Sequence, residues 1–339
     1  MQQRKDLTAW RDPIKGIAIL WVCFFHARLG LAGVPVVGAL HQVGYLGADM
    51  LVFLSGFGLY HSLNRPQSLR DYYARRLKRL LPSYLPICIL WSIIMIPMLN
   101  LSTVQAIRTV FGNLTMLGFM AETPRYINWY ISFLLISLLI APIVHSVLSN
   151  AHKPRLAWAL MVLGAGLIGL CYVAHNQLIL YSRLPLFVLG MGFAMPTKGK
   201  EHPKMSFILY VLGFAAGAVM LWLCLNRYTE LLMDYGMYWY PGLLMIPPIC
   251  AALGWLFRKL SAISFLFAPL RLLGKASFEI FLYNTWFELY CKEVAQFTEP
   301  KDYLLWMVLS IIAGVLTHLG IGWVTKTVTG KAHPEASHT

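Results

Sequence analysis

Lys15 and His26 lie eleven residues apart, and every residue between them, GIAILWVCFF, is apolar. On an α-helix, eleven steps of about 100° return to nearly the same face, about 16 Å further along the axis. Imidazole is well suited to take a proton near neutral pH. We therefore predict a helix face with a cation near one end and a general base near the other. The alternative is a neutral histidine that donates to the backbone of a neighbouring helix.

The next apolar segment, GYLGADMLVFLSGFGLYHSL (44–63), carries Asp49 and Ser55. Because the connection is short, we expect the two helices to be antiparallel neighbours. Counting the helical rise from the membrane surface places His26 at a depth between these two residues. Asp49 is therefore predicted to fix the tautomer of His26 and to support its charged form. Ser55, followed by glycine, is equally compatible with close helix packing.

A dense basic cluster follows this second segment. Arg75, Arg76, Lys78 and Arg79 fall within five residues and are followed by Pro82. Guanidinium groups bind phosphate in a bidentate manner, so the cluster fits a phosphorylated ligand. The alternative is a basic anchor on the cytoplasmic side of a membrane.

Composition indicates whether these residues lie in water or in a lipid bilayer. The 339-residue chain is 58% hydrophobic and 12% charged, whereas soluble domains carry roughly 25% charged residues. Apolar runs long enough to cross a bilayer recur throughout, without the alternation typical of a barrel, which predicts an all-α integral membrane protein. We place about ten transmembrane helices, at 14–33, 43–63, 82–100, 129–149, 156–174, 181–196, 206–225, 238–257, 274–293 and 303–325.

The basic residues predict the orientation of these helices. With a cytoplasmic N-terminus, 21 of the 28 Lys and Arg residues fall on the inner side, which is the bias expected of cytoplasmic loops. Both termini are therefore predicted to be cytoplasmic, in one transmembrane domain (1–339) without an appended soluble domain. The net charge of +14 then reflects topology and attraction to anionic lipid, not nucleic acid. The six cysteines are scattered singly, so we expect neither a metal site nor a disulfide framework.

Five of these features occur together and in order in one known family. A basic residue eleven positions before a histidine, the GxLGxD…SGF segment, and RRxxRxxP resemble the motifs of the membrane acyltransferase 3 family. The segments NWYISFLLISLLIAP (128–142) and LLGKASFEIFLYNTWF (272–287) resemble its later motifs.

The resemblance implies a ten-helix enzyme that moves acyl groups from cytoplasmic acyl-CoA to extracytoplasmic sugars or glycolipids, in the bacterial cytoplasmic (inner) membrane. It implies that His26 is the essential histidine and that Arg75, Arg76 and Arg79 are the cytoplasmic arginines. Acyl-CoA, most simply acetyl-CoA, would be a co-substrate, and no permanently bound cofactor is implied.

Two positions depart from the family pattern. Lys15 stands where the family usually has arginine, which keeps the charge but loses the forked geometry. Asn284 stands where a histidine is common. Glu288, one turn further on, is a candidate substitute for that histidine, although a pairing with Lys292 at i, i+4 is favoured.

Taken together, the sequence predicts an O-acyltransferase. Arg75, Arg76, Lys78 and Arg79 would bind the nucleotide of acyl-CoA, with Ser55 assigned to the donor side. Lys15 would mark the entrance of the pantetheine arm, and His26 would activate the acceptor hydroxyl.

Trp129 and Tyr130 are predicted to contact the acceptor sugar, together with Asn284 and Glu288. The alternative for the two aromatic residues is the interfacial belt of membrane proteins. The alternative for the whole chain is a transporter or flippase that uses the same polar pocket. Such proteins typically contain two related halves, and the sequence contains no such repeat.

Overall fold

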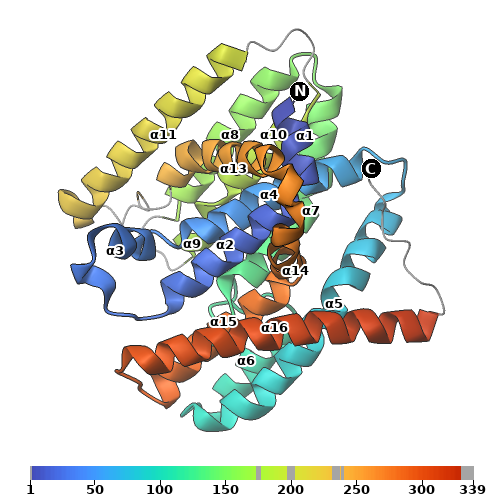
Figure 1. Ribbon diagram of the computed structural model, residues 1–339. Helices are drawn as coiled ribbons and strands as arrows, with labels where there is room; N and C mark the ends of the chain where they lie inside the picture. Colours follow the sequence, from blue (N-terminus) through green and yellow to red (C-terminus); the bar gives the residue numbers. More distant parts are fainter. Residues whose placement is uncertain (1, 173–176, 197–202, 231–236, 238–239, 330–339) are drawn as a thin grey trace.

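The computed structural model describes residues 2–172, 177–196, 203–230, 237 and 240–329, and these form helices without any strand (Figure 1). The α-helices are α1 (Gln2–Ala9), α2 (Arg11–His26), α3 (Pro35–Gln42), α4 (Leu46–Leu63), α5 (Leu69–Met95), α6 (Thr103–Leu114), α7 (Trp129–Asn150), α8 (Pro154–Leu170), α9 (Leu178–Tyr181), α10 (Leu184–Ala194), α11 (Pro203–Asn226), α13 (Pro241–Lys259), α14 (Ala268–Lys275), α15 (Ser277–Leu289) and α16 (Pro300–Thr329).

Six helical stretches in the described part of the chain are long and apolar enough to cross a membrane. They are Leu46–Leu63, Leu69–Met98, Trp129–Asn150, Phe207–Asn226, Pro241–Lys259 and Pro300–Thr327. This confirms an all-helical, multi-pass membrane protein. The predicted spans 14–33, 156–174, 181–196 and 274–293 fall on shorter helices, so the count of ten is not confirmed. Residues 173–174 and 238–239 of the predicted spans lie outside the described residues.

Helix α2 lies between α4 and α14 and contacts both extensively (Figure 1). Glycines allow the close approach. Gly16 faces the backbone of Leu270, and Gly274 faces the backbone of Asp12, so closely that a Cβ atom on either glycine would overlap the facing carbonyl group. Small residues at such crossings let helix backbones pack tightly where lipid supplies no hydrophobic driving force. The packing fixes the helix that carries both Lys15 and His26.

We expect Gly274→Ala to lower the stability of the folded protein by about 1–3 kcal/mol, the usual cost of overpacking, because the new methyl group meets the carbonyl oxygen of Asp12. Unfolding in mixed detergent micelles would measure the change. Gly164→Ala is the matched control, since nothing lies within 4 Å of a Cβ atom at that position of α8. Equal stability of the two variants would contradict this account of the α2–α14 contact.

The chain leaves the helical path at His26, seven residues before the end of the predicted span. After Ala27, which is extended, it forms a short 3₁₀ turn and then α3. The indole nitrogen of Trp21 donates to the carbonyl oxygen of Leu40 at 2.8 Å, and the His41 ring lies 2.6 Å from the carbonyl oxygen of Ala27. These contacts fold α3 back against the end of α2.

This reversal changes the register of α2 against α4. Gly44 faces Trp21 and Phe25, whereas Gly47 faces Ala18 and Val22. His26 therefore lies near the start of α4, beyond Gly44, and Asp49 lies further toward the predicted inner side. The predicted depth of His26, between Asp49 and Ser55, is wrong because the count assumed that the first helix continues to residue 33.

Candidate active site

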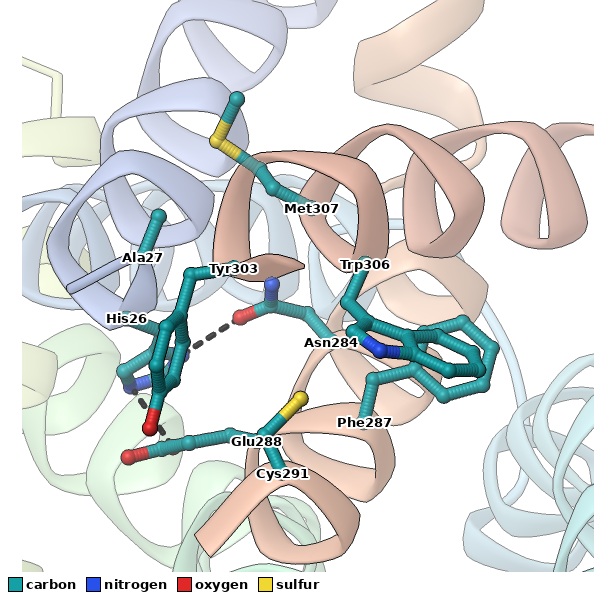
Figure 2. A pocket seen from close by; sticks show the side chains of 9 residues that line it. All are labelled: His26, Ala27, Asn284, Phe287, Glu288, Cys291, Tyr303, Trp306 and Met307. Carbon is teal, nitrogen blue, oxygen red and sulfur yellow. Dashed lines mark hydrogen bonds and ion pairs between the residues drawn. The ribbon is translucent and has the colours of Figure 1, made fainter. Parts of the chain in front are cut away.

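His26, the last residue of α2, meets two polar side chains of α15 (Figure 2). Its Nδ1 atom lies 2.5 Å from Oδ1 of Asn284, and its Nε2 atom lies 3.6 Å from Oε2 of Glu288. The first distance is a short hydrogen bond, and the second is longer than a hydrogen bond. Asn284, which departs from the family pattern, and its candidate substitute Glu288 are thus direct neighbours of the histidine.

A chain of hydrogen bonds sets the orientation of Asn284. The hydroxyl of Ser310 donates to the carbonyl oxygen of Met307 at 2.7 Å, and Nδ2 of Asn284 donates to that hydroxyl oxygen at 3.4 Å. The amide oxygen of Asn284 then faces His26. Because an amide oxygen only accepts hydrogen bonds, Nδ1 of His26 must carry the proton. In the neutral ring, Nε2 is left with a free lone pair and is able to take a proton.

Glu288 makes the predicted contact with Lys292 and a second contact, with His26. Its Oε1 atom is paired with Lys292, one turn further along the chain, and its Oε2 atom faces His26. Both side chains are mostly buried, with 18% of His26 and 21% of Glu288 exposed. A carboxylate in this position stabilises the imidazolium that forms when Nε2 takes a proton.

A small pocket lies beside these polar groups (Figure 2). Apart from His26, Asn284 and Glu288, its lining residues are mainly apolar or aromatic: Ala27, Phe287, Cys291, Tyr303, Trp306 and Met307. The rings of Phe287 and Trp306 lie 4.9 Å apart, and the hydroxyl of Tyr303 donates to the carbonyl oxygen of Phe297. The pocket therefore combines a proton acceptor with a wall that limits access of water.

Asp49 does not contact His26, which corrects the sequence prediction. Its Oδ1 atom lies 2.7 Å from Nε of Arg183, and the two side chains are only 1% and 2% exposed. Arg183 also donates to the carbonyl oxygen of Ile179 at 2.6 Å. The partner that a carboxylate inside a membrane requires is thus an arginine on the α9–α10 connection. Arg183 was not among the site residues predicted from the sequence.

Trp129, one of the two aromatic residues predicted to contact the acceptor, packs against this buried ion pair. The guanidinium of Arg183 lies 4.3 Å above the ring of Trp129. Tyr130 is buried, and its ring lies 4.7 Å from the ring of Phe281. Ser55 donates to the carbonyl oxygen of Leu51 at 2.7 Å. The structure therefore groups Trp129 with Arg183, and neither Trp129, Tyr130 nor Ser55 lines the pocket at His26.

The basic cluster meets the opposite end of α2. Arg11, Arg76 and Arg79 are close enough to Lys15 for their positive charges to act on it, and Asp12 is the acidic group that opposes them among the described residues. Like charges gathered this way repel one another unless an anion is bound. Lys15 and the arginines of α5, far apart in the sequence, thus form one cationic site.

The members of this site differ in exposure. Arg75, Lys78 and Arg79 are exposed, and half-buried Arg76 lies over the ring of Tyr72 at 5.7 Å. Three cations are thus free to meet a ligand from solvent, and Arg76 is held by its aromatic neighbour.

A buried carboxylate that sequence reasoning missed, Glu279, lies in the first turn of α15. Glu279 is 5% exposed and contacts Ser83 of α5 and His318 of α16. An acidic residue in the apolar segment ASFEIFLY is a signal for a functional or paired group inside a membrane.

The chain matches a known protein family. One family model, described as an acyltransferase domain, matches residues 9–324, which include α2, the basic cluster of α5 and the pocket at His26. No curated protein matches the chain. No solved structure matches it either. Since the family model spans nearly the whole chain, the protein belongs to the acyltransferase 3 family of membrane proteins.

Proposed function

We propose that this membrane acyltransferase moves an acyl group from acyl-CoA, most simply acetyl-CoA, to a hydroxyl group of a carbohydrate or glycolipid acceptor. One observation carries the proposal. Helix α2 bears a histidine whose Nε2 is free to accept a proton at one end and joins a cationic cluster at the other. The eleven residue steps from Lys15 to His26 correspond to a rise of about 16 Å.

The cationic cluster suits the donor. The phosphates of coenzyme A carry several negative charges, which Arg75, Arg76 and Arg79 would bind in the bidentate manner typical of guanidinium groups. Lys15, which is close enough to Arg79 for the charge of Arg79 to act on it, would mark the point where the pantetheine arm leaves the phosphates and follows α2. The thioester would then arrive close to His26.

His26 would act as the general base. Its Nε2 takes the proton of the acceptor hydroxyl while the hydroxyl oxygen attacks the thioester carbonyl carbon. When the carbon–sulfur bond breaks, the imidazolium returns the proton to the thiolate, so the transfer consumes no net proton. Asn284 keeps the ring in the required tautomer, and Glu288 stabilises its charged form.

The acceptor would approach the pocket from the end of α2 that carries His26. If the basic residues mark the cytoplasmic side, this end faces the outside of a bacterial cytoplasmic membrane, where surface glycans are exposed. Tyr303 and Trp306 supply aromatic faces in the pocket and replace Trp129 and Tyr130 as candidates for contact with a sugar ring.

The binding of acetyl-CoA to purified protein in nanodiscs tests the proposal. We expect the wild type to bind the donor and to hydrolyse it slowly. The double variant Arg75→Ala/Arg79→Ala should weaken binding by about 10–100-fold, because charge-assisted contacts to phosphate are lost. Raised salt should weaken binding by the wild type as well.

The matched control is Lys153→Ala/Arg155→Ala, which removes the same charge from exposed positions at the start of α8. This control should bind acetyl-CoA as the wild type does. Failure of the wild type to bind acetyl-CoA would overturn the assignment of the donor. Equal binding by both double variants would overturn the role of the two arginines.

A further inference from the structure

Glu279 is a buried carboxylate that the proposed transfer does not use. Its Oε1 atom accepts a hydrogen bond from the hydroxyl of Ser83 at 2.6 Å and lies 3.3 Å from Nδ1 of His318. Both contacts fall on the same oxygen. The other oxygen, Oε2, is buried and has no hydrogen-bond partner among the described residues.

An unpartnered carboxylate oxygen is costly in this environment. Buried polar groups are almost always hydrogen-bonded, and a group left without a partner loses the favourable free energy of hydration. Only 5% of Glu279 is exposed, so bulk water does not supply the missing bond. Because an ionised carboxylate is solely an acceptor, the group that completes it must be a donor such as an N–H or O–H.

The position of Glu279 indicates which hydrogen-bond donor would meet Oε2. On α5, Ser83 follows Arg79 by four residues and therefore lies one turn beyond it on the same helix face. On α15, Asn284 follows Glu279 by five residues, a rise of about 7.5 Å. Along the helix axes, Glu279 therefore lies between the cationic cluster and the pocket at His26, at the height that the arm of the donor would pass, and its carboxylate faces α5 and α16.

The backbone packing holds Glu279 in this place. Gly314 of α16 packs so closely on α15 that a Cβ atom there would approach the Cα atom of Ile280 to 2.5 Å. His318 follows Gly314 by one turn, and this close approach brings its ring to Glu279. Contacts from α5 and α16 thus hold the carboxylate in place, and Oε2 is left without a hydrogen-bond partner among the described residues.

We propose that Oε2 of Glu279 accepts a hydrogen bond from an amide N–H of the pantetheine arm. The arm carries two amides, and the separation from Asn284 matches the amide farther from the sulfur atom. Ser83 and His318 hold the carboxylate ready for this contact. The inference rests on the proposed function, since it presumes that acyl-CoA is the donor.

The test compares acetyl-CoA, S-acetyl-pantetheine and S-acetyl-N-acetylcysteamine, which keeps the thioester and the nearer amide but lacks the farther one. The variant is Glu279→Gln, which preserves size and replaces one acceptor oxygen by a donor. We expect its KM for acetyl-CoA and S-acetyl-pantetheine to rise about tenfold or more, as for a lost hydrogen bond to a charged group. Its kcat should be unchanged, and its KM for the truncated donor should equal that of the wild type.

Each other outcome has a distinct meaning. A variant that is equally impaired with all three donors indicates a structural role and overturns the inference, as does a variant that is unimpaired with all of them. A wild type that uses none of the donors overturns the proposed function itself. Glu293→Gln, which changes an exposed carboxylate paired with Arg125 at 3.0 Å, is the control for the substitution and should behave as the wild type.

Discussion

Replacing His26 with glutamine is expected to lower the rate of acyl transfer by about 10²–10⁴-fold, the range typical of a lost general base. Glutamine retains a polar side chain that can contact Asn284 but has no atom that takes a proton near neutral pH. Binding of acetyl-CoA should be unchanged, because the cationic cluster lies at the other end of α2. Acceptor-dependent transfer and donor binding, measured on the same nanodisc preparation, separate the two effects.

His145→Gln is the matched control for this experiment. His145 lies on α7 and contacts Asn64 at 2.9 Å, which is outside the pocket at His26. This variant should transfer acyl groups at the wild-type rate. A His26→Gln variant with nearly full activity would show that another group accepts the proton, and Glu288, the carboxylate that faces His26, would be the first to examine.

Removing the side chain of Asp49 is expected to destabilise the fold and not merely to slow the reaction. In Asp49→Ala, Arg183 would remain buried without the carboxylate that lies 2.7 Å from its Nε atom. Breaking one side of a buried ion pair costs about 3–5 kcal/mol. Unfolding in mixed micelles should show this loss, and any protein that remains folded should bind acetyl-CoA normally.

A second variant distinguishes this structural role from the predicted catalytic one. Replacing both partners, as Asp49→Leu/Arg183→Met, removes the uncompensated charge and should recover most of the lost stability. If Asp49 instead acted on His26, the double variant would be stable yet inactive. Stable and active protein would confirm that the pair serves packing between α4 and the α9–α10 connection.

The membrane environment and the helical secondary structure of this protein could be predicted from composition and local spacing. A chain with 12% charged residues and repeated long apolar runs has to satisfy its backbone hydrogen bonds within helices when it lies in lipid. The helical period alone put Lys15 and His26 on one face. The i, i+4 rule gave the pairing of Glu288 with Lys292, which the structure confirms.

The partners of the buried polar groups could not be predicted in this way. The contact between His26 and Asn284 joins residues 258 positions apart, and no local pattern encodes such a distance. Asp49 was matched with the wrong partner because depth was counted along a helix that in fact ends at His26. A carboxylate in lipid needs a partner, but helix packing selected Arg183.

Local periodicity thus determined which residues share a helix face, because that depends only on the helical repeat. Tertiary structure decided which helix faces meet, because these contacts depend on where each helix ends and on which glycines allow close approach. The tautomer of His26 follows from the tertiary structure alone. It depends on the orientation of Asn284, and Ser310 and Met307 of a third helix fix that orientation.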